Sequence, residues 1–161
     1  MATSLLWPLP GRNGIVNIGV DEILSAFPAL NPEKLAITSP ATPLYNCIAW
    51  AGGDTYRKWW PDVTRIGYWP KGVPRIETIT AFQMAFETLG FVLCASDRLE
   101  DGQEKIAFFH KDKIPTHAAR QLPNGLWTSK LGESFDVAHD LHGLEGAQYG
   151  RLALIMQRAT K

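Results

Sequence analysis

The chain has 161 residues, of which 45% are hydrophobic and 20% are charged, and its sixteen basic residues balance its sixteen acidic ones. This composition is typical of a globular protein and excludes an intrinsically disordered chain. Because there is no excess of positive charge, we expect no nucleic-acid partner and no binding to an anionic membrane.

The N-terminal residues predict neither a leader nor a membrane anchor. The stretch before Pro10 lacks the positive charge and the long apolar run of a secretory signal peptide, and no segment is long enough to span a bilayer. The chain contains two cysteines, Cys47 and Cys94. We therefore predict a cytoplasmic protein with free thiols, and export by a leaderless route stays open.

A single domain is expected over residues 1–161, since a chain of this length can bury a sizeable core. Residues 1–40 are predicted to form a largely extended arm. One short helix interrupts the arm over residues 21–27, where apolar side chains share a face, and Pro28 ends it.

A second short helix is predicted to begin at Cys47. Asn46 is a suitable N-cap, because its side-chain oxygen can accept a hydrogen bond from a free amide of the first turn. Gly52 and Gly53 offer an early end to this helix. A thiol in the first turn lies near free amides and the positive end of the helix dipole, which stabilise a thiolate, so Cys47 is the candidate nucleophile.

A longer helix is predicted over residues 76–89, where apolar residues recur at three- and four-residue spacing and Gly90 follows. A solvated helical turn is expected at residues 136–142 in preference to a metal site. Strands are predicted at residues 91–94, 105–109, 116–122, 126–131 and 151–157. Helices followed by antiparallel strands predict an α+β fold, with N-terminal helices packed on a small sheet.

The turn at residues 123–125 sets the register of one hairpin. A three-residue loop pairs Gln121 with Trp127 and places His117 and Ser129 on one uncharged face, which we expect to pack against the Cys47 helix. The alternative two-residue loop would shift the register by one residue. Proline suits the first position of the longer loop, which favours the first register. In the alternative register, Thr128 and Lys130 lie beside His117.

This arrangement suggests that Cys47 attacks a carbonyl while His117 acts as the base and then protonates the leaving group. Ser129 or Gln121 is a candidate to orient the imidazole, as are Asp136, His139 and Asp140. Oxyanion and substrate contacts are expected from Asn46, Tyr45, Trp50, Gln121 and Trp69. The alternative is that Cys47 and His117 are ordinary core residues, since free cysteines are among the most buried residue types.

Several segments resemble a bacterial family of small uncharacterised proteins. They are Asn46 to Ala51, Tyr68 to Arg75, Thr116 to Gly125, Trp127 to Gly132 and Leu144 to Gly150. The resemblance spans residues 40–158 and implies no activity.

More distantly, the order of capped cysteine helix, histidine strand and polar residue on the next strand resembles the papain-like superfamily, including NlpC-type endopeptidases and amidases. That resemblance implies a papain-like fold with Cys47 as nucleophile, His117 as base and Ser129 in the place of the orienting residue.

The sequence therefore predicts a cysteine hydrolase or transferase that acts on an amide, peptide or isopeptide bond of a peptide, a protein or a small molecule. No cofactor and no metal are expected. One alternative is a non-catalytic binding protein that uses an aromatic loop as its contact surface. The loop contains Trp59, Trp60, Tyr68 and Trp69. Another alternative is a bacterial toxin or effector with the same chemistry.

Overall fold

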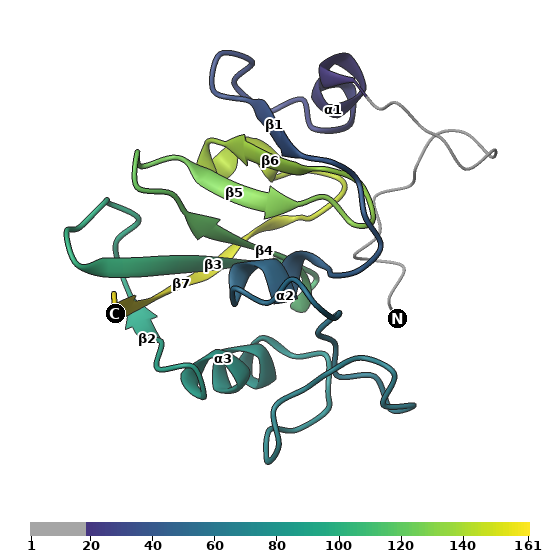
Figure 1. The fold of residues 1–161 in the computed structure, drawn as a ribbon, viewed down its shortest axis with the longest axis vertical. Coiled ribbons are helices and arrows are strands. Elements are labelled where there is room, and N and C mark those ends of the chain that lie inside the picture. Colours follow the sequence, from purple (N-terminus) through teal and green to yellow (C-terminus); the bar gives the residue numbers. More distant parts are fainter. Residues whose placement is uncertain (1–18) are drawn as a thin grey trace.

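A computed structural model describes residues 19–161, so the first 18 residues of the predicted arm lie outside the described part. A seven-stranded antiparallel sheet, in the order β1-β6-β5-β4-β3-β7-β2, forms most of this structure (Figure 1). Its strands are β1 (Ala36–Ser39), β2 (Val92–Cys94), β3 (Gln103–Lys111), β4 (Ile114–Gln121), β5 (Trp127–Lys130), β6 (Asp136–His139) and β7 (Arg151–Ala159).

The helices are short, and side chains cap two of them. They are α1 (Val20–Ala26), α2 (Cys47–Ala51), α3 (Ile79–Glu87) and the 3-10 helix η2 (Leu141–Leu144). The Asn46 side chain accepts a hydrogen bond from the Ala49 amide at 3.1 Å, which confirms the predicted cap of α2. Thr78 caps α3 in the same way, so this helix begins three residues later than predicted.

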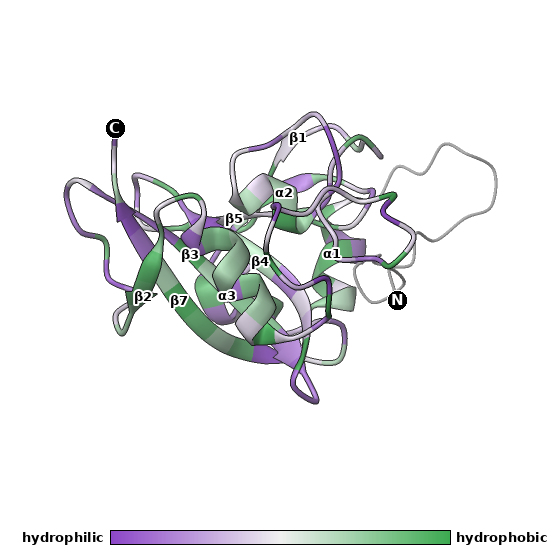
Figure 2. Ribbon diagram, turned by 90° about the horizontal axis from the view of Figure 1, so that it is seen from below, coloured by the Kyte–Doolittle hydropathy of each residue, from purple (hydrophilic) through white to green (hydrophobic). Residues whose placement is uncertain are grey.

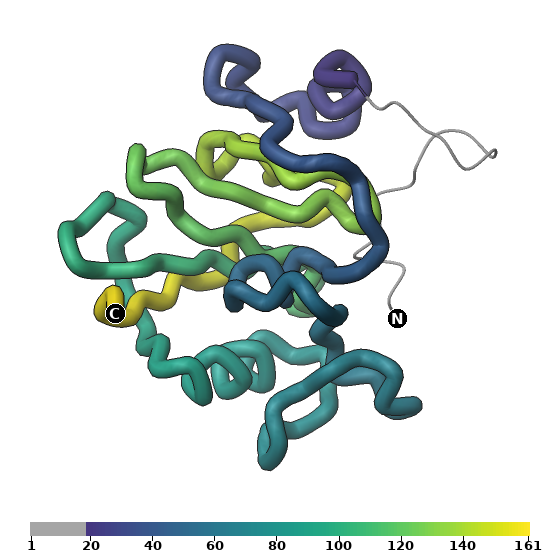
Figure 3. Tube along the Cα trace, in the orientation of Figure 1, coloured from purple at the N-terminus to yellow at the C-terminus, as the bar shows by residue number. Residues whose placement is uncertain are grey.

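The predicted papain-like α+β fold, in which N-terminal helices pack on a small sheet, is wrong. Residues 36–39 and 136–139, expected as part of an arm and as a helical turn, form β1 and β6 and widen the sheet to seven strands. The three α-helices have only seven, five and nine residues. Figure 3 follows the chain from β1 at one edge of this sheet round to α2.

The sheet separates two hydrophobic cores, because neighbouring residues of a strand point to opposite faces. Ile106 and Phe108 of β3 lie on the face that α2 and α3 cover, here called the α2/α3 face. Ala107 and Phe109 lie on the opposite face with α1 and Tyr149, here called the α1 face. Figure 2 shows α3 lying across β3 and β7, with hydrophobic residues along β7.

The register predicted for the β4–β5 hairpin is confirmed. Gln121 pairs with Trp127, and the Leu122 amide donates to the Leu126 carbonyl at 2.7 Å across the three-residue loop. Gly125 has a φ of 87°, the left-handed conformation that this loop requires.

The turn before β7 approaches the backbone of β3 closely at Gly150. A Cβ at this position would lie 2.0 Å from the His110 carbonyl oxygen, and the φ of Gly150 is 75°. We expect Gly150→Ala to lower the free energy of unfolding by about 3 kcal/mol, because both the backbone contact and the dihedral are unfavourable. Urea unfolding followed by tryptophan fluorescence measures this loss.

Gly53→Ala is the matched control. Gly53 has a φ of 84° but no described atom within 4 Å of the added Cβ, so only the dihedral cost of about 1 kcal/mol is expected. Equal losses in the two variants would show that the contact with His110 contributes nothing.

Candidate functional site

Cys47 lies at the start of α2, and its side chain is completely buried. Asn46 fixes this helix start to the following loop, because its side chain also donates to the Trp59 carbonyl at 2.7 Å and accepts from the Trp59 amide at 3.0 Å. Burial raises the pKa of the Cys47 thiol to about 12, although the backbone amides of Ala118 and Ile48 act in the opposite direction. Desolvation therefore outweighs the effect of the helix terminus.

His117 lies on the other face of the sheet from Cys47. It pairs with Phe109 across β3 and β4, and its ring stacks on Tyr149 with the centroids 4.0 Å apart and an angle of 8° between the planes. Cys47 packs instead with Ala118 in the core of the α2/α3 face. The prediction that His117 faces the cysteine layer is therefore wrong, because α2 packs on the face that carries Ala118.

His117, Ser129 and His139 form a chain of hydrogen bonds inside the α1 face. The Ser129 hydroxyl lies 2.8 Å from His117 Nε2 and 2.7 Å from His139 Nε2. His139 Nδ1 lies 2.8 Å from the Asp140 carbonyl oxygen, which can only accept. His139 Nδ1 is therefore the protonated nitrogen, and His139 Nε2 accepts from Ser129.

The same reasoning identifies which nitrogen of His117 is protonated. Ser129 donates to His139, so it accepts from the Nε2–H of His117, and both imidazoles are neutral. His117 Nδ1 then carries a lone pair, and it is buried without a hydrogen-bond partner among the described residues. Burial lowers the pKa of His139 to about 4 and that of His117 well below its usual value. These hydrogen-bonded histidines can transfer no proton to Cys47, because Cys47 lies on the other face of the sheet.

Tyr45 and Trp50, which were predicted to contact the substrate, lie against each other and not beside His117. Tyr45 and Trp50 stack with their centroids 5.5 Å apart. The Tyr45 hydroxyl donates to Asp136 Oδ2 at 2.6 Å, and the Trp50 indole donates to the Thr128 hydroxyl at 3.2 Å. Burial, together with the hydrogen bond to Asp136, raises the pKa of Tyr45 to about 12. These groups connect α2 to β5 and β6.

Lys130, beside this group, is a buried cation that the favoured register placed outside the predicted site. Its ammonium group donates to the carbonyls of Gly132, at 3.0 Å, and Ser134. Burial lowers its pKa to about 8. Gln121, by contrast, lies at the end of β4, where its amide donates to the Asp97 carbonyl at 2.8 Å.

The tryptophans of the aromatic loop point into the core. Trp59, Trp60 and Trp69 are all buried, and the rings of Trp60 and Trp69 lie 5.1 and 4.9 Å from that of Phe82 in α3. The Trp69 indole also donates to the Pro74 carbonyl at 2.9 Å. These rings anchor the loop and are not its contact surface.

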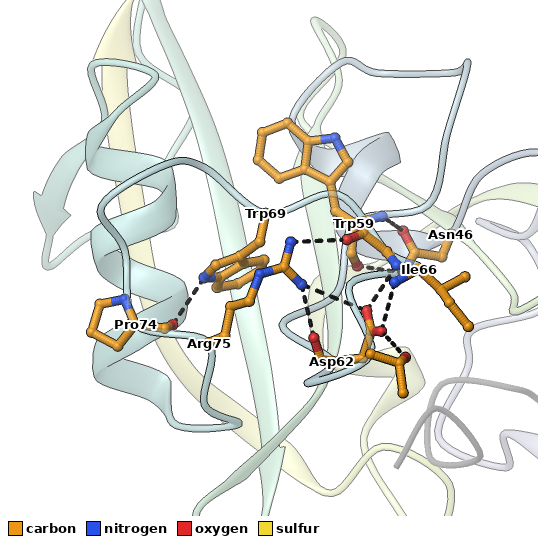
Figure 4. Close-up of polar contacts among 9 residues, drawn as sticks. Asn46, Trp59, Asp62, Ile66, Trp69, Pro74 and Arg75 are labelled. Carbon is orange, nitrogen blue, oxygen red and sulfur yellow. Dashed lines mark hydrogen bonds and ion pairs between the residues drawn. The ribbon is translucent and has the colours of Figure 1, made fainter.

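Asp62 and Arg75 fix the outer part of this loop (Figure 4). The Asp62 carboxylate accepts from the amides of Ile66 and Gly67, each at 2.8 Å, and from the Thr64 hydroxyl. Arg75 donates to the carbonyls of Asp62 at 2.8 Å and Gly67 at 3.2 Å. The hydrogen bonds of Asp62 lower its pKa, although burial acts in the opposite direction. The sequence analysis did not identify this pair, because no local pattern links two residues that are thirteen positions apart.

A backbone hydrogen bond joins the two ends of this loop, and the tip of the loop is exposed. The Trp60 amide donates to the Tyr68 carbonyl at 2.9 Å, so residues 60–68 form a compact Ω-loop. Val63 is 86% exposed and Ile66 is 89% exposed, and Ile66 points away from the Asp62 network (Figure 4). A fixed loop that presents two aliphatic side chains to solvent is a candidate contact surface.

The fold and these contacts define an antiparallel β-sheet protein with a buried polar network on each face. Residues 36–157 match the family described as "Domain of unknown function (DUF7689)", and the chain belongs to this family. The resemblance to a family of uncharacterised proteins is confirmed to that extent. No curated protein and no solved structure matches the chain, and these comparisons do not support the papain-like resemblance. Within residues 19–161, no helix has the length and apolar character needed to cross a membrane.

Thiol labelling tests the environment of Cys47. In the Cys94→Ser variant at pH 7.5, we expect iodoacetamide to modify native Cys47 about a thousandfold more slowly than the unfolded chain, because only the thiolate reacts. Mass spectrometry of timed samples with and without urea measures both rates. Rapid native labelling that His117→Ala abolishes would instead show a functional Cys–His pair.

Acid stability tests the neutral histidine chain. An unfolded histidine titrates near 6.5, whereas folded His139 titrates near 4, so the unfolded chain binds more protons between these values. We expect the free energy of unfolding to fall by about 3 kcal/mol as the pH falls through this window, and His117 acts in the same direction. Urea unfolding at pH 7.5, 6.0 and 4.5 measures the slope.

His139→Gln should remove its own share of this pH dependence, about 3 kcal/mol, and leave the share of His117. His142→Gln should preserve the full dependence, because His142 is exposed and lies outside the hydrogen-bonded network. A slope that His139→Gln leaves unchanged would rule out a buried neutral His139.

Proposed function

We propose that this protein is a non-catalytic interaction module that contacts a partner protein through the tip of its Ω-loop. One observation carries the proposal: the loop is fixed in one conformation while Val63 and Ile66 are almost fully exposed. Aliphatic side chains held out of the core bring no stability to the chain that carries them. They are useful when a partner buries them, with about 1.5–3 kcal/mol for each side chain.

The loop is prepared for binding, which lowers the cost of association. Arg65 holds a left-handed φ of 60°, a conformation that a non-glycine residue adopts only when its surroundings fix it. The Asp62 carboxylate and the Arg75 guanidinium supply this restraint. A rigid loop loses little conformational entropy when it binds.

Charge indicates the chemistry of the partner. Arg65 is exposed at the tip, and no ion pair to it exists within residues 19–161, whereas the Asp62 carboxylate is occupied by the loop's own donors. An apolar surface with acidic groups at its rim complements this tip. The net charge of zero favours a protein over an anionic membrane as the partner.

The geometry does not favour the cysteine hydrolase or transferase, which stays a prediction. Cys47 is completely buried with a raised thiol pKa, and His117 lies on the opposite face of the sheet. A toxin or effector with the same chemistry would need the same pair.

Photo-crosslinking from position 66 tests the interaction. A photoreactive residue at Ile66, in the full chain and in its natural cells, should capture a protein that the same residue at Val92 does not. Val92 is the control because it is 58% exposed on β2, away from the loop.

The captured protein is then purified and its affinity is measured by calorimetry. We expect Val63→Ser with Ile66→Ser to weaken binding by at least about a hundredfold, and Arg65→Glu to weaken it further at low salt. Val92→Ser should bind like the original chain. Equal binding by the loop double variant would reject the loop as the contact surface.

A further inference from the structure

A cleft of about 500 Å³ opens on the α2/α3 face, beyond the C-terminal end of α2. Gly52 and Gly53 lie on one side of it, and the ends of β3, β4 and β7 form its floor. The cleft has three cationic side chains, from Lys105, Arg120 and Arg158. Because two glycines border it, backbone and not side chains limits access from that side.

Two of these cations are neutralised by the protein itself. Lys105 forms an ion pair with Glu100 and donates to the Ser96 carbonyl at 2.8 Å. Arg158 forms an ion pair with Glu104 at 2.5 Å and donates to the Leu89 carbonyl at 2.8 Å. Neither has charge available for a ligand.

Arg120 differs from both. Its guanidinium carbon lies 4.1 Å from the centre of the Trp50 ring, which uses one flat face of the group and leaves its N–H donors free. No hydrogen bond or ion pair joins its side chain to residues 19–161, although it is partly buried. Asp136 and Glu104 are near enough to favour its charge electrostatically, but neither pairs with it.

Trp50 holds this group in place. The indole donates to Thr128 at 3.2 Å, and its ring stacks on Tyr45, so the surface beneath Arg120 is fixed. Arg120 is half-buried, and this burial lowers its pKa while the guanidinium remains charged. A desolvated cation with free, fixed donors gains more from an anion than an exposed one does.

We infer that the cleft binds the carboxylate of a small organic acid or of a peptide C-terminus, with the Arg120 guanidinium as its anchor. The planar fork of N–H donors matches the two oxygens of a carboxylate. Asp101 borders the same cleft, forms no ion pair within residues 19–161, and repels a doubly charged phosphate more strongly than a carboxylate. Phe91 and Leu99 supply an apolar wall for the rest of the ligand.

This site is separate from the Ω-loop, so its test does not depend on the proposed protein partner. The full chain, labelled with ¹⁵N, is titrated with hexanoate, hexanamide and inorganic phosphate while amide and indole signals are recorded. We expect hexanoate to shift the Trp50 indole and the Gly52 and Gly53 amides in a saturable manner. Hexanamide should cause no such shift, and phosphate should bind at least tenfold more weakly.

Variants test the anchor. Arg120→Gln should weaken hexanoate binding at least tenfold, and Arg120→Lys should weaken it less, because a lysine keeps the charge but loses the fork. Arg151→Gln, an exposed arginine outside the cleft, is the matched control and should bind like the original chain. The shift map of the unaltered chain stands by itself if Arg120→Gln fails to fold.

Two peptides with the same apolar residues, one with a free C-terminal carboxylate and one amidated, identify the source of the carboxylate. Tighter binding of the free-carboxylate peptide than of hexanoate assigns the site to protein C-termini, and the reverse assigns it to small acids. Equal shifts with hexanoate and hexanamide, stronger binding of phosphate, or full binding by Arg120→Gln would each overturn the inference.

Discussion

The two-residue alternation of β4 is the constraint on which both faces of this protein depend. Ala118 has almost no side chain, so α2 can lie close to the strand and bury Cys47 against its backbone. The same alternation turns His117 and Ala119 toward α1 and Tyr149. A shift of one residue in the register would exchange the two sets, so the separation of thiol and imidazole is fixed by the pairing of the strand.

Burial decides the chemistry of the groups that look reactive. Cys47 has the free amides of a helix start, yet removal from water raises the pKa of its thiol. The two histidines are held neutral by the same effect, and Ser129 bonds to the Nε2 atoms of both because a hydroxyl can donate and accept at once. A neutral network of this kind stabilises one arrangement of β4, β5 and β6, since the Ser129 hydroxyl and the two histidine Nε2 atoms would otherwise be buried without hydrogen bonds.

Local features could be predicted from the sequence, and the choice of face could not. The Asn46 cap and the turn at residues 123–125 depend on neighbouring residues alone, and both are present in the structure. The face of His117 was expected to pack against the Cys47 helix because it carries no formal charge, whereas Arg120 and Lys130 lie on the opposite face. Both are covered, Arg120 by the ring of Trp50 and Lys130 by backbone carbonyls, and these contacts come from segments distant in sequence.

The strands β1 and β6 were not predicted from the sequence for a related reason. They are four residues long and pair with each other, so neither has a strong pattern of its own. Asp136 supplies part of the connection, because its carboxylate accepts from Ser39 and from Tyr45, which joins β1 to the residues before α2. A buried aspartate appears polar in a sequence and is therefore assigned to a turn or a surface.

The helix α2 connects the two surfaces for which binding is proposed. At its first end, the Asn46 side chain holds both the amide and the carbonyl of Trp59, where the loop begins its path toward the Ω-loop. At its other end, Gly52 and Gly53 border the cleft, and Trp50 lies beneath Arg120. The helix α2, packed on β4 and β5, and the residues that flank it therefore set the position of both surfaces. The cap that resembles the start of a catalytic helix has a structural use: it fixes the loop to the sheet and leaves the thiol buried beneath it.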